Sequence, residues 1–179
     1  TEYIEKKLHL KVNKEKTVVS YIRGVKYLGY SFYVQNGKCE LSVHPKSKAK
    51  MKSRLKELTS RSNGMGYEKR RLALAEYVRG WVGYYHLANM KRFLGETDEW
   101  LRRRIRMCIW KHGRKPRRKV ENLIKCDIDK RRAYMWGNTR LGYWRIADSP
   151  ILHTAISNVN LKLKGYPCLL DSYLKWHPK

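Results

Sequence analysis

The chain has 179 residues, enough for one ordinary domain or for two small ones. It carries 41 Lys and Arg against 15 Asp and Glu, and the formal net charge of +26 excludes the surface of an average cytosolic enzyme. Apolar residues make up 42% of the chain, which excludes a disordered basic tail. The aromatic residues are mainly 13 Tyr and 6 Trp, against 2 Phe, and such rings suit half-buried or base-stacking surfaces. This combination is typical of a folded nucleic-acid binder.

The N-terminal part predicts the end of a helix and then a β-hairpin. Apolar residues recur at helical spacing within residues 1–9. Asn36-Gly37 is the signature of a type I′ turn, and the segments on either side are aromatic-rich or alternate in polarity. We therefore expect a hairpin over residues 26–43. Because an isolated hairpin is marginally stable, it needs a helix or sheet to pack against.

From Pro45 onward the pattern is helical. Proline suits the first position of a helix, and Met51, Leu55 and Leu58 share one apolar face that lysines flank. A polar loop containing glycine follows.

A second helix is expected over residues 67–90. Gly80 and Gly83 inside it each cost about 1 kcal/mol relative to Ala. They indicate either close packing against another helix or a kink. The predicted apolar face consists of Leu74, Val78, Trp81 and Tyr85.

A third helix is expected to begin at Thr97, a good N-cap residue. Asp98 and Glu99 would then lie in the first turn, where acids are favourable. The helix ends near Gly113. Its apolar face comprises Leu101, Ile105, Cys108 and Ile109. The opposite face carries Arg102, Arg103 and Arg106.

The remaining residues predict three or four short helices around a loop, with Ser149-Pro150 as the start of one of them. The expected fold is mainly α with a small β-hairpin. It consists of a three-helix bundle followed by a basic region of short helices. The expected domain boundaries are 1–44, 45–115 and 116–179.

No common catalytic motif occurs in the sequence. It has no P-loop, no Gly-x-Ser-x-Gly and no His-Glu-x-x-His. The cysteines at 39, 108, 126 and 168 form no Cys-x-x-Cys pair, so we expect reduced thiols rather than a zinc site or a disulfide framework. From the residues alone we predict no catalytic residue, no metal site and no cofactor in this chain.

The strongest binding signal is the basic stretch 102–119, within which no acidic residue occurs. A solvated helix face usually mixes both signs of charge, so we favour phosphate contact over that alternative. Arginine is also suited to bidentate contact with phosphate. The lysine-flanked helix that begins at Pro45 is a weaker signal, because a merely soluble helix carries the same pattern.

Two aromatic segments each allow two interpretations. The sequence GYWR at 142–145 suits either stacking on a base or pinning a loop to the core, and both stay open. The sequence YVRGWVGYY at 77–85 favours core packing, with Arg79 as its surface group. The candidate nucleic-acid-binding residues are Lys46, Lys48, Lys50, Arg79, Arg102, Arg103, Arg106, Lys111, Arg114, Lys115, Arg117, Arg118, Tyr143, Trp144 and Arg145.

Several segments resemble one family in the same order along the chain. LKVNKEKT (10–17) and KYLGYSF (26–32) resemble the last part of the palm in group II intron reverse transcriptases, also called maturases. YVRGWVGYYHLA (77–88) and DEWLRRRIRMCIWKHGRKP (98–116) are similar to the maturase-specific region of that family. GYWRIADSPILHTAI (142–156) is similar to its C-terminal portion.

The resemblance implies the end of a palm at 1–44, the thumb (domain X) at 45–115 and a basic DNA- or RNA-binding region at 116–179. The family's polymerase site is a Tyr-x-Asp-Asp hairpin with an upstream Asp, and the chain lacks the hairpin motif. Magnesium is therefore expected only in a catalytic half that is absent here. The parent protein would be an RNA-directed DNA polymerase, whereas this chain alone would not be an enzyme.

Five residues match palm positions of the family. Lys16 matches the lysine near the leaving pyrophosphate, and Tyr27, Leu28, Gly29 and Tyr30 match the hairpin that grips the primer. Both roles require a complete palm.

The implied partners are intron RNA, an RNA template with its DNA primer, target DNA and an N-terminal catalytic half. The chain would assist splicing and retrohoming by binding, while the RNA performs the splicing chemistry. The implied location is the bacterial cytosol or nucleoid, without a membrane partner. The alternatives are a stand-alone basic RNA- or DNA-binding module and one half of a split reverse transcriptase. The primer-grip-like hairpin discriminates against the stand-alone module, which has no use for it.

Overall fold

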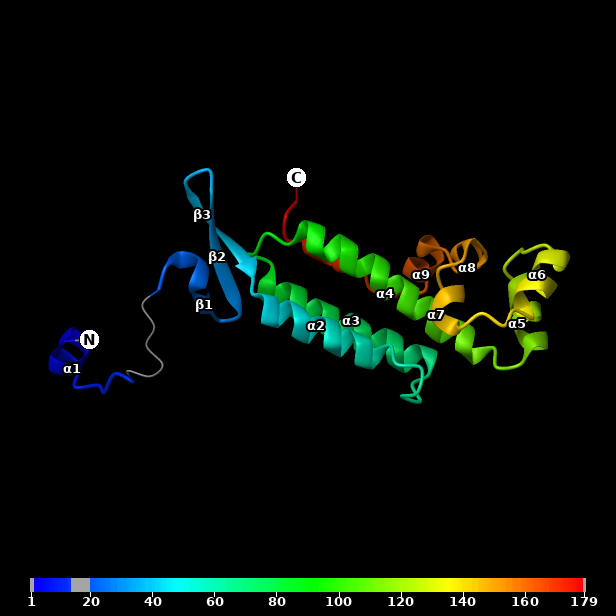
Figure 1. The fold of residues 1–179 in the computed structure, drawn as a ribbon, viewed down its shortest axis with the longest axis horizontal. Coiled ribbons are helices and arrows are strands. Elements are labelled where there is room, and N and C mark those ends of the chain that lie inside the picture. Colours follow the sequence, from blue (N-terminus) through cyan, green and yellow to red (C-terminus); the bar gives the residue numbers. More distant parts are fainter. Residues whose placement is uncertain (1, 14–19, 179) are drawn as a thin grey trace.

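The computed structural model describes residues 2–13 and 20–178. Within these residues it contains ten α-helices, one 3₁₀ turn (η1, Ile22–Gly24) and one three-stranded sheet, which confirms the predicted class (Figure 1). The strands are β1 (Lys26–Tyr27), β2 (Tyr30–Gln35) and β3 (Lys38–Val43). The helices are α1 (Glu2–Lys7), α2 (Pro45–Leu58), α3 (Tyr67–Tyr85), α4 (Lys91–His112), α5 (Pro116–Ile124), α6 (Lys130–Gly137), α7 (Tyr143–Ile146), α8 (Pro150–Ala155), α9 (Asn158–Leu163) and α10 (Leu169–Leu174). The predicted N-terminal helix end is α1, which buries none of its residues.

The sheet is the predicted hairpin with one additional strand. β2 and β3 pair antiparallel, and Asn36 and Gly37 connect them with φ angles of 50° and 74°. Two successive positive φ angles are those of the expected type I′ turn. β1 pairs with the other edge of β2 through a second tight turn at Leu28 and Gly29, where φ is 50° and 84°. This second turn lies at the residues that match the primer-grip hairpin of the family, although no local turn signal predicted it.

Gly29 fixes the sheet to the helices. Its carbonyl accepts hydrogen bonds from the backbone N–H of His44 at 2.9 Å and from the Ser47 hydroxyl at 3.1 Å. A Cβ atom at Gly29 would lie 2.3 Å from the Tyr85 hydroxyl oxygen. Both this close approach and the positive φ therefore require glycine, and the hairpin packs against the start of α2 and the end of α3.

Replacing Gly37 by valine is expected to lower the free energy of unfolding by about 1–3 kcal/mol, because a β-branched residue is strained at positive φ. No atom of the described residues lies within 4 Å of the Cβ position, so the strain comes from the backbone and not from packing. A thermal melt measures the effect. The control is Gly142→Val, where the Cβ position is equally open but φ is −61°. An unchanged melt of the Gly37 variant would contradict the turn.

Helices α2, α3 and α4 form the bundle. The predicted face of α2 is buried, as expected. The buried face of α3 contains Leu74, Val78 and Val82, whereas Trp81 and Tyr85 pack at its edge and stay partly exposed. The bundle core is therefore largely the one predicted, except that Val82 is the buried residue of the last turns of α3 instead of Trp81 and Tyr85.

Two expectations for α3 were wrong. The helix ends at Tyr85 rather than at Met90, and a turn follows. Gly80 is exposed, and no described atom lies within 4 Å of its Cβ position, so it does not mark close helix packing. At Gly83 the nearest such atom is Cζ2 of Trp176, at 3.9 Å.

The predicted start of α4 at Thr97 was also wrong. The helix begins at Lys91, and the Thr97 hydroxyl donates to the Phe93 carbonyl inside it at 2.7 Å. Leu94, which is fully buried, extends the apolar face toward the N-terminus. The capping propensity of Thr97 was thus overridden by packing of the preceding turn.

A second core joins the end of α4 to the short helices. Between residues 116 and 178 the structure contains six helices rather than three or four, because α7 lies within the expected loop. Ser149-Pro150 begins α8, as predicted. The buried residues of this core are Trp110, Val120, Leu123, Ile128, Ala133, Ile146, Ile151, Leu152 and Ala155.

The C-terminal helix α10 returns to the first core. It packs against α3 and α4, and Leu169 and Tyr173 are buried among the residues of the bundle. Leu161 and Tyr166 join the same core. The expected region 116–179 therefore contributes to both cores, and α10 acts as a fourth helix of the bundle.

Candidate nucleic-acid interface

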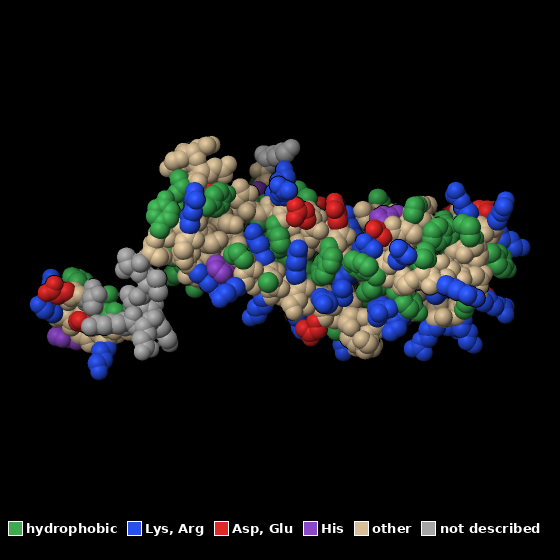
Figure 2. Space-filling model, viewed as in Figure 1, with side chains coloured by type: hydrophobic (Ala, Val, Ile, Leu, Met, Phe, Trp, Pro, Cys, Tyr) green, Lys and Arg blue, Asp and Glu red, His purple; other side chains and the backbone are tan. Residues whose placement is uncertain are grey.

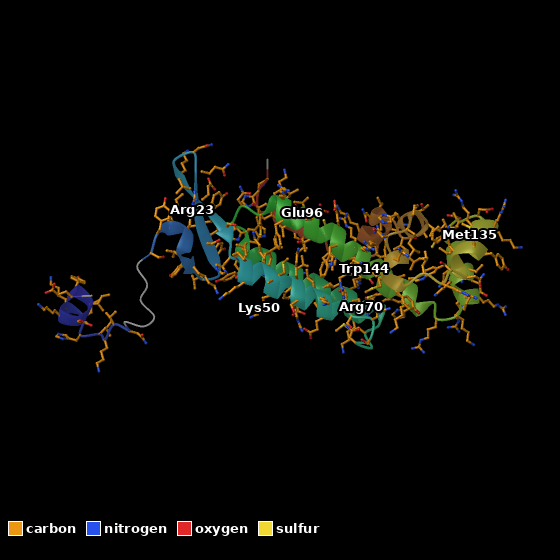
Figure 3. The ribbon with its side chains drawn as sticks, in the orientation of Figure 1. Arg23, Lys50, Arg70, Glu96, Met135 and Trp144 are labelled. Carbon is orange, nitrogen blue, oxygen red and sulfur yellow. The ribbon has the colours of Figure 1, made fainter. Side chains whose placement is uncertain are left out.

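Basic side chains cover the outer side of α2. Lys46 and Lys50 are exposed, and Lys50 lies on the outer side of the helix (Figure 3). Lys48 is half-buried, with its ammonium 5.0 Å from the centre of the Phe93 ring. Arg79 is exposed on α3. Figure 2 shows Lys and Arg side chains spread along this face of the molecule, with few acidic side chains among them.

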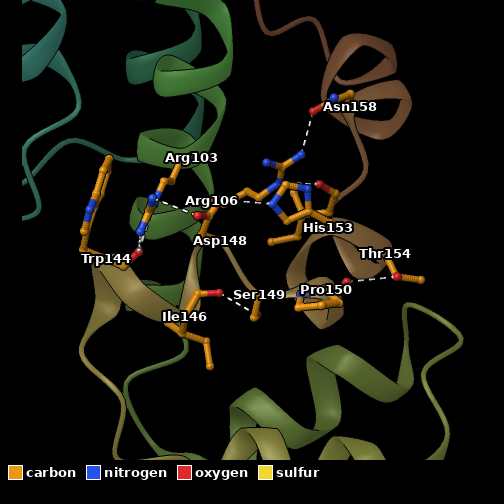
Figure 4. A network of polar contacts seen from close by, with 11 residues as sticks. Arg103, Arg106, Trp144, Ile146, Asp148, Ser149, Pro150, His153, Thr154 and Asn158 are labelled. Atoms are coloured by element: carbon orange, nitrogen blue, oxygen red, sulfur yellow. Dashed lines mark hydrogen bonds and ion pairs between the residues drawn. The ribbon is translucent and has the colours of Figure 1, made fainter.

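Arg106 is buried, although it was expected on the exposed face of α4. Only 2% of its surface is exposed. Its Nε donates to the Ile156 carbonyl at 2.9 Å, and Nη2 donates to Oδ1 of Asn158 at 2.6 Å (Figure 4). Burial lowers the pKa of its guanidinium. The expectation failed because residues around α8 and α9 cover this side of α4, so Arg106 is unavailable as a surface phosphate ligand.

Arg103 and Trp144 form a stacked pair beside α4. The guanidinium carbon lies 4.0 Å from the centre of the indole ring, and the arginine donates to the Trp144 carbonyl at 3.0 and 3.2 Å. Arg103 also forms an ion pair with Asp148 at 2.8 Å (Figure 4). The loop is thus pinned through its backbone, while Trp144 stays 40% exposed. Both interpretations of the GYWR segment therefore describe part of this arrangement.

Asp98 has a role that the sequence analysis missed. It is buried, and its carboxylate accepts hydrogen bonds from the N–H groups of Leu169 and Leu170, each at 2.8 Å. The Cys168 thiol donates to it at 3.1 Å. Burial raises the pKa of that thiol to about 11, and Arg102 donates to its sulfur at 3.3 Å. Asp98 and Arg102 therefore hold the start of α10 against α4.

Arg104, which the sequence did not single out either, joins α4 to the end of α2. Its Nε donates to Oγ1 of Thr59 at 2.6 Å. Its Nη2 donates to the carbonyls of Lys56 at 2.9 Å and Thr59 at 3.1 Å. Burial lowers the pKa of this guanidinium. The arginine-rich face of α4 thus supplies structural contacts to α2, to the loop before α8 and to α10.

The segment that leaves α4 presents the exposed cations instead. Arg114, Lys115, Arg117 and Arg118 are all exposed at the start of α5. Arg117 is paired with Glu121 at 3.1 Å. Their charges face solvent, as an interface for phosphates requires.

The comparison with known families concerns this region. Residues 48–126 match the family described as "Group II intron, maturase-specific domain". This chain contains a group II intron maturase-specific domain. The match confirms the resemblance of the segments 77–88 and 98–116 to the maturase-specific region, and it spans most of α2 and all of α3, α4 and α5. No curated protein matches the chain.

The exposed cations continue beyond the maturase-specific domain into α6. These residues were not among the candidates predicted from the sequence. Helix α6, in which Met135 is labelled, lies at the far end of the molecule (Figure 3). The exposed basic residues of this part are Lys130, Arg131, Arg132 and Arg140.

Two aromatic rings form cation–π contacts with basic side chains where α7 meets the maturase-specific domain. Tyr143 is half-buried, with the Arg61 guanidinium 5.1 Å and the Lys119 ammonium 5.3 Å from its ring centre. Lys119 also lies 4.9 Å from the centre of Trp110, and burial lowers its pKa. Arg145 is exposed.

The primer-grip-like residues form the β1–β2 turn in front of the maturase-specific domain. Tyr27 and Leu28 are each 63% exposed. The Tyr84 hydroxyl donates to the Leu28 carbonyl at 3.0 Å, and the Tyr30 hydroxyl donates to the Tyr84 carbonyl at 2.5 Å. Lys16 lies outside the described residues.

Two features are absent from the residues that the structure describes. None of the helices in that part of the chain is long and apolar enough to cross a membrane. No group of three or more His, Cys, Asp or Glu side chains within the same residues could hold a metal ion.

Proposed function

We propose that this chain is the nucleic-acid-binding part of a group II intron reverse transcriptase/maturase. It clamps intron RNA, and the duplex of RNA template and DNA primer, to assist splicing and retrohoming. The observation that carries the proposal is the maturase-specific domain at 48–126, whose last helix presents four exposed cations at its start. RNA helices are recognised mainly through phosphates, shape and 2′-hydroxyls, which exposed cations suit.

The proposed roles of the three regions follow the domain boundaries expected from the sequence. Residues 1–44 act as the end of the palm, with the Tyr27–Tyr30 turn near the primer. Residues 45–115 act as the thumb, and residues 116–179 extend the basic surface toward DNA or RNA. The chain has no Tyr-x-Asp-Asp sequence, so polymerisation is assigned to a catalytic half that supplies the metal-binding aspartates.

Removing Arg117 and Arg118 together is expected to weaken the binding of duplex RNA without changing the fold. For every phosphate that is no longer neutralised, the slope of log affinity against log salt concentration becomes shallower by roughly 0.9. The folding change stays within about 0.5 kcal/mol, because both side chains are exposed. The measurement is RNA affinity at several salt concentrations, together with a thermal melt.

The matched control replaces Lys91 and Arg92 by alanine. It removes the same number of charges from the start of another helix, and Arg92 pairs with Glu96 at 3.0 Å as Arg117 pairs with Glu121. The control keeps the wild-type slope if the surface around α5 is the interface. Equal slopes for both variants and the wild type would contradict the proposal.

A further inference from the structure

A basic pocket opens between the end of α2 and the last turns of α4. Its volume is about 510 Å³, within the ~300–1,000 Å³ typical of small-molecule sites. Three of the residues that line it are cationic, and none of the described lining residues is acidic. The lining residues of this basic pocket are Ser60, Arg61, Ser62, Arg104, Met107, Lys111 and Trp144.

Hydrogen bonds from neighbouring side chains hold the walls of the basic pocket in place. Arg70, only 3% exposed and directed into the molecule (Figure 3), donates to the Leu58 carbonyl at 3.3 Å and to Oδ1 of Asn63 at 3.1 Å. Lys111 donates to the Arg61 carbonyl. The loop that carries the two serines is therefore tied at both ends to the helices. A preformed site loses less entropy when a ligand binds.

The charges of the basic pocket are not neutralised by acids. The Arg104 pKa is lowered first by burial and then by the nearby charge of Arg61. Among the described residues, neither these two arginines nor Lys111 forms an ion pair with an acid. A bound anion would relieve this repulsion. The hydroxyls of Ser60 and Ser62, 3.2 Å apart, can donate hydrogen bonds to such an anion.

The remaining wall is aromatic. Trp144 lines the basic pocket, and Arg103 stacks on one face of its indole at 4.0 Å. Trp144 stays 40% exposed, which leaves area for a second planar group. A cation cluster beside an exposed indole is the combination that binds a phosphate together with an unstacked base.

We propose that the basic pocket binds one unpaired nucleotide of the RNA, with its phosphate against Arg61 and Lys111 and its base stacked on Trp144. This inference rests on the proposed function, since it names the feature of the RNA that this part of the chain reads. Paired nucleotides cannot enter, because their bases are stacked within the helix. The chain therefore distinguishes an RNA helix with a bulge from a continuous one.

The experiment compares two RNA duplexes that differ by a single unpaired 2-aminopurine, a fluorescent base. Wild-type protein is expected to bind the bulged duplex about tenfold more tightly than the continuous duplex. Stacking on the indole also quenches the 2-aminopurine fluorescence. Trp144→Leu is expected to abolish both the preference for the bulge and the quenching. Arg61→Gln reduces the preference, and it keeps the test valid if the tryptophan variant folds poorly, because Arg61 is exposed.

The controls are Trp176→Leu, at an exposed tryptophan outside the basic pocket, and Arg92→Gln. Both are expected to keep the preference for the bulge. Equal binding of the two duplexes by the wild type, or a preference that survives in both pocket variants, overturns the inference and leaves the proposed function standing. If the wild type binds neither duplex, the proposed function fails as well.

Discussion

Replacing Arg106 by alanine is expected to lower the free energy of unfolding by about 3 kcal/mol, although the sequence predicts a harmless surface change. The substitution removes the donors to the Ile156 carbonyl and to Asn158, and it leaves a cavity against α4. Hydrogen bonds from a charged donor contribute about 1.5–3 kcal/mol, and the loss of packing around the buried Arg106 side chain adds to it. Urea unfolding monitored by circular dichroism measures the change.

The control for Arg106 is Arg92→Ala on the same helix, where 94% of the side chain is exposed. Its free energy of unfolding should change by no more than about 0.5 kcal/mol. At temperatures where both variants are folded, we expect the Arg106 variant to keep the wild-type salt dependence of RNA binding. A normal melt together with a flattened salt dependence would show that Arg106 contacts phosphates instead.

Replacing Asp98 by alanine is expected to cost about 2–3 kcal/mol and to release α10 from the bundle. The carboxylate accepts two backbone N–H groups at the start of α10 and the thiol of Cys168. Hydrogen bonds to a charged acceptor contribute about 1.5–3 kcal/mol, and in the packed bundle the two N–H groups would lack a partner, which favours the release of α10. Urea unfolding gives the free energy. Hydrogen exchange at Leu169 and Leu170 reports the release of the helix directly.

Two further variants test the Asp98 prediction, one conservative and one a control. Asp98→Asn keeps one carbonyl oxygen as an acceptor, so its loss of stability should be smaller than that of the alanine variant. Glu99→Ala, at the exposed neighbour on α4, should leave the exchange rates of α10 unchanged. If Asp98→Ala unfolds at the wild-type urea concentration, the carboxylate does not hold α10 as described.

The local elements could be predicted because their signals are local. The turn at Asn36 and Gly37 and the buried face of α2 depend on conformational preference and on one periodic stripe. The apolar stripe of α4 gave a wrong prediction of which residues are exposed, because a single stripe implies a single buried face. Helix α4 instead contacts the bundle on one side, and α7 and the residues around α8 and α9 on another. Arg106 and Asp98 are therefore buried at positions that the periodicity assigns to the surface or to a helix start.

The candidate interface was predictable in part for the same reason. Arg117 and Arg118 follow a proline at the start of a short helix, and their exposure agrees with the prediction. The basic pocket was not predictable, because Arg61, Arg104 and Trp144 come from three separate segments that only the tertiary fold brings together. No spacing in the sequence relates these residues.

The return of α10 to the first core bears on the order in which the protein folds. The bundle is closed by Leu169 and Tyr173, which pack against helices made much earlier in synthesis. At roughly 5–20 residues per second, translation from residue 126 to residue 174 takes roughly 2–10 s. During this interval the apolar side of α3 and α4 that α10 later covers has no packing partner. Transiently exposed apolar surface of this kind makes a nascent chain prone to aggregation until α10 has been made.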